Sequence, residues 1–220
     1  MAESDASPLY SKTAILVYCA LIATAFAWSA YEPADGPTWL LESFPVILAA
    51  PILALTYRRF PLTSLAYILI GLHACVLLVG GHYTYAEVPL FNWLRDHFSL
   101  ARNDYDRVGH FMQGAVPAIL AREVLLRTSP LKRGSWLFFL VTCVCMAISA
   151  CYELVEWLSA ILLGQGADAF LGTQGDPWDT QWDMFMCLVG ALSAQLLLSR
   201  WHDRELEGAR SARSEVKSKK

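Results

Sequence analysis

The chain has 220 residues, of which 55% are hydrophobic and 17% are charged, and its formal net charge is −3. Soluble domains carry about 25% charged residues and a smaller apolar share, so this composition excludes an ordinary soluble domain. The small net charge gives no reason to expect a nucleic-acid partner.

Six apolar runs are each long enough to cross a bilayer, which takes about 20 residues of helix. The fourth run is the least apolar, because Asp106, Arg107, His110 and Gln113 lie in its first turns. The runs predict an all-α, polytopic membrane helix bundle. A soluble helical protein is the alternative, which the long runs and short loops disfavour. The predicted helices cover residues 13–31, 39–57, 62–83, 106–126, 136–163 and 182–201.

The positive charges predict how the bundle is oriented. If the N-terminus is inside, only Arg95, Arg102 and Arg107 of the 17 Lys and Arg residues fall in outer segments. Positive charges collect on the cytoplasmic side of membrane proteins, so both termini are predicted to be cytoplasmic. Residues 1–12 then form a polar N-terminus, residues 13–201 the transmembrane domain, and residues 202–220 a charged, disordered tail.

The cysteines all fall within apolar runs, whereas a disulfide or zinc framework would place them in loops at paired spacings. We interpret them as small buried hydrophobic residues. They are Cys19, Cys75, Cys143, Cys145, Cys151 and Cys187.

Polar residues recur at helical spacing in the last three predicted helices. Asp106, His110 and Gln113 follow one another at steps of four and three residues, which places them on one helical face. The next predicted helix carries Glu153 and Glu156 three residues apart. The last is entered through the stretch GTQGDPWDTQWD, which contains Asp176, Asp179 and Asp183. In the predicted topology these groups all meet at the outer side.

The two glutamates make a bound cation the simplest prediction. They lie roughly 10–15 Å inside the outer end of their helix at the standard helical rise, where ionised carboxylates cannot remain unpaired. Arg107 is the only nearby fixed positive charge expected in this reading. A divalent metal ion of open identity would balance the charge. The predicted metal ligands are His110, Glu153, Glu156, Asp179 and Asp183.

If the site is catalytic, three of these residues have roles in proton transfer or in positioning. Asp106 would orient His110, and Asp176 or a spare glutamate such as Glu156 would move the proton of a metal-bound water. A structural reading stands beside this one. Asp176 lies in a Gly-Asp-Pro-Trp sequence that suits a turn, and Asp179 suits the N-cap of the last helix.

At these residues the sequence resembles the YjdF-type family of bacterial inner-membrane proteins, a family without an established biochemical function. The matching stretches are GGHYTYAEVP, RNDYDRVGHFMQG, YELVEW and FLGTQGDPWDTQWDM, which span residues 80–192. The resemblance implies a multi-pass protein of the bacterial inner membrane. The order of Asp106 and His110, the glutamates, and Asp183 before Gly190 is also similar to that of VanZ-like membrane proteins, which implies an activity near the cell envelope.

Three functions fit these observations. The leading hypothesis is a metal-dependent enzyme that acts on a lipid or envelope-linked substrate at the outer leaflet. The alternatives are a proton- or cation-coupled transporter and a non-catalytic scaffold or sensor with a structural ion site. The sequence leaves the substrate, the metal and the oligomeric state open.

Overall fold

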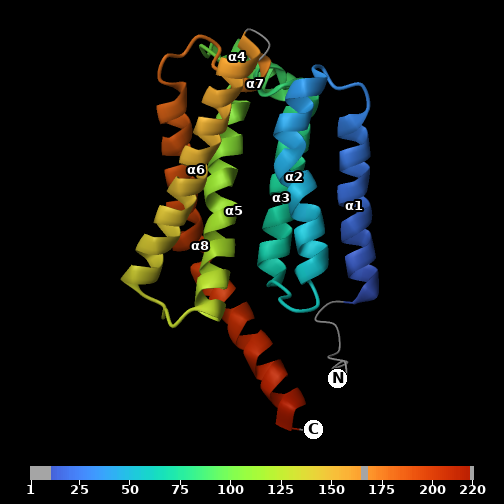
Figure 1. The fold of residues 1–220 in the computed structure, drawn as a ribbon, viewed down its shortest axis with the longest axis vertical. Helices are drawn as coiled ribbons and strands as arrows, with labels where there is room; N and C mark the ends of the chain where they lie inside the picture. The colour runs from blue at the N-terminus through green and yellow to red at the C-terminus, as the bar shows by residue number, and fades with distance from the viewer. Residues whose placement is uncertain (1–10, 165–167, 219–220) are drawn as a thin grey trace.

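In a computed structural model of the protein, residues 11–164 and 168–218 are described, and they contain helices and loops without a strand. The long helices run side by side along one axis (Figure 1). They are α1 (Lys12–Ala30), α2 (Gly36–Thr56), α3 (Ser64–Tyr83), α5 (Tyr105–Thr128), α6 (Ser135–Leu163) and α8 (Asp179–Ser218). The short elements are η1 (Tyr85–Glu87), α4 (Pro89–Phe98) and α7 (Asp168–Leu171).

Five of the long helices, α1, α2, α3, α6 and α8, are long and apolar enough to cross a membrane by length and composition. The prediction of an all-α membrane bundle is therefore confirmed. The remaining predicted span is the fourth in chain order, α5, and it is the polar one. It packs against α3, α6 and α8, so its charged side chains face other helices. That position suits a helix that brings ionisable groups into the interior of a membrane bundle.

The two ends of the bundle differ (Figure 1). One end, here called the loop end, holds η1, α4, α7 and the first turns of α5 and α8. The opposite end, here called the tail end, holds the first and last described residues of the chain. Arg95, Arg102 and Arg107 lie at the loop end, as the topology requires. The assignment of the loop end to the outer face stays a prediction.

Glycines let α5 and α8 pack with their backbones in contact. A Cβ atom added at Gly114 would overlap the carbonyl group of Cys187, and one added at Gly190 would overlap the carbonyl group of Phe111. Small residues allow this close approach between membrane helices. The contact fixes the register of the two helices, and with it the distance between their polar first turns.

A buried ionic network joins α3, α5 and α8 at the tail end. The Glu123 carboxylate is fully buried and accepts hydrogen bonds from the Thr63 hydroxyl (2.8 Å) and from Arg127 Nη1 (2.6 Å). His202 Nε2 lies 3.1 Å from the same carboxylate, and His202 Nδ1 lies 2.9 Å from Arg122 Nη1. An arginine can only donate, so the imidazole accepts at Nδ1 and donates to Glu123 at Nε2.

The tail differs from its prediction. Residues 202–218 continue α8 as helix, whereas the sequence predicts disorder from residue 202. Leu206 is buried, and the Glu205 carboxylate accepts a hydrogen bond of 3.0 Å from the backbone N–H of Leu65. Extending an existing helix avoids the unfavourable nucleation step, and this segment is rich in helix-forming Ala, Arg and Glu. Of the predicted polar N-terminus, residues 1–10 lie outside the described residues.

The cysteines are free, as predicted, but they are not all buried. Cys145 and Cys187 lie inside the bundle, while Cys19, Cys75, Cys143 and Cys151 are exposed on it. In a bilayer such an exposed apolar position faces lipid. An apolar sequence run cannot tell a lipid-facing position from a core position, because both favour apolar residues.

Candidate carboxylate and histidine site

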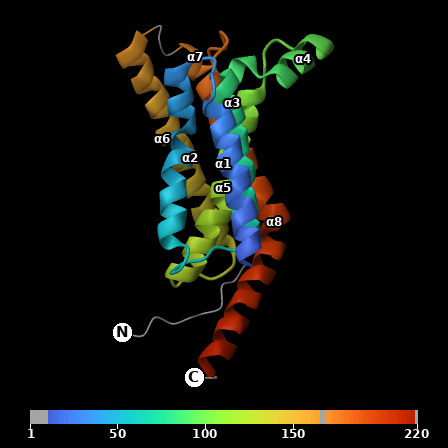
Figure 2. The same cartoon turned by 90° about the vertical axis from the view of Figure 1, so that its right-hand side faces the viewer.

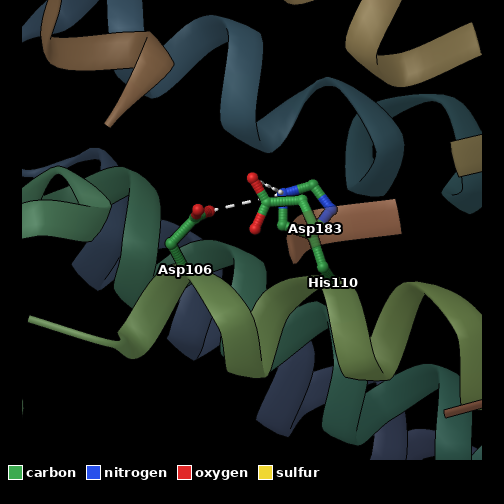
Figure 3. Close-up of side chains that lie close together, drawn as sticks. All are labelled: Asp106, His110 and Asp183. Atoms are coloured by element: carbon green, nitrogen blue, oxygen red, sulfur yellow. Dashed lines mark ion pairs between the residues drawn. The ribbon is translucent and has the colours of Figure 1, made fainter. Parts of the chain in front are cut away.

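The site is built on the first turns of α5, the helix at the centre of the bundle. Asp106 and His110 lie one turn apart on α5, and Asp183 faces them from the second turn of α8 (Figure 3). His110 Nε2 lies 3.4 Å from Asp106 Oδ1 and 4.0 Å from Asp183 Oδ2. The sequence spacing predicts that Asp106 and His110 share a face, and the glycine contact between α5 and α8 brings Asp183 to them.

The other nitrogen of His110 faces α6. Its Nδ1 atom lies 3.2 Å from Gln113 Oε1 and 3.8 Å from Glu153 Oε1. The ring also packs edge-on against Tyr152 at a centroid distance of 6.0 Å. His110 therefore has its two nitrogens in different polar surroundings, one formed by α5 and α8 and the other by α5 and α6.

Two carboxylates of the site are buried without well-formed hydrogen bonds. Both oxygens of Glu153 and Oδ1 of Asp183 lack a hydrogen-bond partner among the described residues, and the two residues are 7% and 1% exposed. A buried polar group without a partner costs about 1–3 kcal/mol, and an unpaired charge costs more. These oxygens are therefore candidate binding positions for a proton or a cation.

Two sets of ligand atoms are close enough to share an ion. One set is Asp106, His110 and Asp183, and the other is His110, Glu153 and Glu156; within each set one ligand atom per residue lies within 4.8 Å of the others. Carboxylate oxygens together with one imidazole nitrogen suit Mg²⁺, Mn²⁺, Fe²⁺ or Zn²⁺. All five of these residues are buried.

An ionic cluster covers the site at the loop end. Arg102 is 7% exposed and pairs with the Asp179 carboxylate, and it also donates to the carbonyl oxygen of Gly172 at 3.3 Å. Arg107 Nη2 pairs with Asp176 at 3.2 Å. Burial lowers the pKa of Arg102, but the ion pair with Asp179 outweighs this effect and raises its pKa above the ordinary value. Arg102 thus stays positively charged within the ionic cluster that covers the site.

Arg102 corrects the expectation that Arg107 is the only nearby positive charge. It lies four residues before Asp106, with 3.7 Å between Arg102 Nη2 and Asp106 Oδ2. That spacing is visible in the sequence, but Arg102 precedes the helix, so helical periodicity does not apply to it. Its contact with α8 depends on how the loop before α5 folds.

Asp176 and Asp179 belong to this ionic cover and not to either ligand set. Asp176 Oδ1 accepts a hydrogen bond of 2.9 Å from the backbone N–H of Trp178, which stabilises the turn before α8. Gly175 opens that turn with a φ of +83°, in the region that favours glycine. Asp179 is the first residue of α8, and its carboxylate forms an ion pair with Arg102. Both aspartates therefore have structural partners.

Glu42, which the sequence leaves either at the membrane interface or in the site, joins the site from α2. It is 5% exposed and accepts a hydrogen bond of 3.1 Å from the Tyr152 hydroxyl. A glutamate near the end of an apolar run was the available signal, but it does not show which way the helix faces. His82, in contrast, lies 3.1 Å from the carbonyl oxygen of Ser29 and packs on Trp28.

The site as a whole holds more carboxyl groups than cationic groups. Two arginines and His110 face eight carboxylates, and the arginines are already paired within the cover. The unbalanced groups lie deeper, on α5, α6 and α8. The carboxylates are Glu42, Asp104, Asp106, Glu153, Glu156, Asp176, Asp179 and Asp183.

Comparison with known proteins agrees with the membrane fold. Residues 14–204 match the model of a family described as "Predicted membrane protein (DUF2238)". The chain is 54% identical over 172 residues to the inner membrane protein YjdF of Escherichia coli (strain K12), and the match covers 78% of this chain and 82% of the relative. No solved structure matches the chain.

Proposed function

The chain belongs to the DUF2238 family of predicted membrane proteins, and it is a multi-pass protein of the bacterial inner membrane; we propose that its buried site binds a divalent metal ion and uses it to hydrolyse a lipid or envelope-linked substrate at the outer leaflet. The observation that carries this proposal is the pair of buried carboxylates, Glu153 and Asp183, whose oxygens lack hydrogen-bond partners in the described residues.

The surroundings of His110 favour one of the two ligand sets. Gln113 Oε1 lies 3.2 Å from Nδ1, and a carbonyl oxygen at that place accepts a hydrogen bond. A neutral imidazole with its proton on Nδ1 has its lone pair on Nε2, the atom that faces Asp106 and Asp183. The metal would therefore bind to Asp106, His110 and Asp183, with Gln113 orienting the ring.

The second carboxylate group then has a chemical role. A metal-bound water loses a proton more readily than free water, and Glu153 or Glu156 would accept that proton. The water oxygen would form a bond to the electrophilic atom of the substrate while the bond to the leaving oxygen breaks. The proton would pass to that leaving oxygen, so the glutamate returns to its starting state.

Transport has less support, because a layer of apolar side chains in the described core separates the site from the buried ionic network at the tail end. This layer includes Ala118, Ile119 and Val141, all fully buried. Gln195 Nε2 donates a hydrogen bond of 3.0 Å to the Thr142 hydroxyl. A translocation path would need exposed or hydrated polar groups between the site and the other face.

Metal content tests the first half of the proposal. The protein is purified in detergent without chelator, and bound metals are measured by mass spectrometry alongside Asp183→Asn, Glu153→Gln and the exposed control Glu207→Gln. We expect about one divalent ion per chain in the wild type and in the control, and near loss in Asp183→Asn. Wild-type protein without stoichiometric metal, or full retention in Asp183→Asn, would contradict the site.

Turnover tests the second half. The metal-loaded protein is incubated with vesicles of bacterial inner-membrane lipids, and the products are compared by lipid mass spectrometry with those of Glu156→Gln and of samples treated with a chelator. A product that depends on the metal and on Glu156 supports the enzyme. A protein that binds metal but changes no lipid would instead favour a structural ion site.

A further inference from the structure

The ten-residue helix α4 has almost no packing of its own. None of its residues is buried, and it projects sideways from the loop end of the bundle (Figure 2). A helix this short is marginal in water unless tertiary contacts or a surface stabilise it. Its sequence, PLFNWLRDHF, therefore needs a partner beyond the contacts that the bundle offers.

The helix has one apolar and one polar side. At 100° per residue, Leu90, Trp93, Leu94 and Phe98 fall within one arc, while Asn92, Arg95 and Asp96 fall on the other side. Leu90, Trp93 and Phe98 are exposed by 62%, 57% and 62%. Three large apolar side chains on one face of so short a helix are unfavourable in water, since each could bury apolar area elsewhere.

Other side chains attach α4 to the bundle. Phe91 packs edge-on against Tyr105 at a centroid distance of 5.1 Å. Asn92 Oδ1 accepts a hydrogen bond of 2.8 Å from Asn103 Nδ2. Val88, just before the helix, is buried against Tyr85 and Tyr105. These contacts hold α4 in one orientation, so its apolar face points away from the bundle.

From this arrangement we infer that α4 is an interfacial helix that inserts its apolar face into the leaflet surrounding the loop end. It lies level with the loop ends of the spanning helices (Figures 1 and 2), and so its apolar face is continuous with the surface that the bilayer covers. Amphipathic helices bury such faces about 5–10 Å into the headgroup and acyl boundary. Trp93 is of the residue type enriched at that depth.

Hydrogen bonds connect α4 to the ionic cluster that covers the site. Asn103, which holds Asn92, also exchanges two hydrogen bonds with Gln174, one from its backbone N–H (2.9 Å) and one to its carbonyl oxygen (2.8 Å). Gln174 belongs to the turn before α8, and Arg102, next to Asn103, pairs with Asp179. The leaflet therefore helps to position the loop that covers the carboxylates. This inference does not depend on a metal or on catalysis.

Photocrosslinking from the helix tests the lipid contact. The full chain is placed in nanodiscs of phosphatidylethanolamine and phosphatidylglycerol with p-benzoylphenylalanine in place of Leu90, Trp93 or, as the matched polar-face control, Asp96. We expect lipid adducts at positions 90 and 93 to exceed those at 96 by at least about fivefold. Because 90 and 93 are independent positions, failure of one variant to fold leaves the other to decide.

Two outcomes would overturn the inference. Equal or absent lipid adducts at 90 and 96 would place α4 in water. Adducts to protein at 90 and 93, either to a second copy or to another chain, would make the apolar face a protein-docking surface instead. Metal content is measured on the same samples, so failure of the lipid contact and failure of the metal site remain distinguishable.

Discussion

His110 belongs to both groups of candidate ligands, so the state of its ring decides which group can hold an ion. A neutral imidazole offers one lone pair, and a metal-bound histidine almost always donates its other N–H to an acceptor. Gln113 is that acceptor in the structure, at 3.2 Å from Nδ1. Gln113, which shares a helical face with Asp106 and His110, thereby gains a place in the proposed site.

Replacing Gln113 tests this arrangement directly. Gln113→Leu removes the acceptor and should lower the affinity for metal about 10- to 100-fold, measured by competition with a chelator of known affinity. Gln113→Glu keeps an acceptor oxygen at the same reach and should retain most of the affinity. Unchanged affinity in Gln113→Leu would show that the ring is oriented by other contacts.

Arg102 is the second residue whose role depends on burial. It compensates the Asp179 carboxylate in the cover of the site, where both groups are largely out of water. Arg102→Gln leaves that carboxylate unpaired, and breaking a buried pair costs about 3–5 kcal/mol. We expect a clear drop in the thermal unfolding midpoint in detergent. Arg95→Gln, which removes an arginine that is 32% exposed on α4, should leave the midpoint nearly unchanged, and an equal effect of both variants would contradict the burial argument.

At the level of elements, the backbones of α5 and α8 come into contact where the helices cross at Gly114 and Gly190. A methyl group at either position meets a backbone carbonyl of the other helix, which cannot move aside as a side chain can. Gly114→Ala and Gly190→Ala should each destabilise the bundle by about 1–3 kcal/mol, the usual cost of overpacking, and should weaken metal binding because Asp183 moves away from His110.

Gly208 gives a matched control on the same helix. Nothing lies within 4 Å of a Cβ atom added there, so Gly208→Ala should be neutral or stabilise by up to about 1 kcal/mol through helix propensity. Thermal unfolding of the three variants measures the contrast. Similar midpoints for all three would mean that the helices can separate without loss.

The network around Glu123 makes a comparable prediction at the tail end. The carboxylate accepts hydrogen bonds from Thr63 and Arg127 and lies beside His202 with no exposure. Glu123→Gln removes the charge that balances Arg127, and should destabilise by about 3–5 kcal/mol. Glu207→Gln, at a carboxylate that is 61% exposed, should have little effect in the same unfolding measurement. A midpoint of Glu123→Gln equal to that of the control would show that the network adds no stability.

Some of these elements can be predicted from the sequence and some cannot. Long apolar runs locate the spanning helices to within a few residues, because bilayer thickness sets their length. The helix α4 is missed, since ten amphipathic residues are too short for a span and resemble a polar loop. The helical tail of α8 is missed because its charged composition resembles a disordered segment, although His202 and Leu206 are buried against the bundle.

The same division holds within the site. Helical spacing predicts that Asp106 and His110 share a face, because that contact lies within one helix. The contacts of Arg102 with Asp179 and of Glu42 with Tyr152 join residues 77 and 110 positions apart. Such contacts depend on helix rotation and loop path, which one sequence does not encode in any local pattern.

At the scale of the whole molecule, the remaining question is which membrane face the site serves. The structure places both ends of the described chain at the tail end (Figure 1), and of the Lys and Arg residues that the structure describes only Arg95, Arg102 and Arg107 belong to the loop-end segments. The positive charges at the other end should keep it in the cytoplasm. The carboxylate site would then open toward the periplasmic leaflet, where envelope substrates reside.

Reporter fusions at the C-terminus test this orientation in the intact membrane. Green fluorescent protein becomes fluorescent in the cytoplasm, and alkaline phosphatase becomes active only outside it, because its disulfides form in an oxidising compartment. We expect the fluorescent fusion to be bright and the phosphatase fusion to be inactive at matched expression. The reverse pattern would turn the site toward the cytoplasm, and a lipid substrate would then have to come from the inner leaflet.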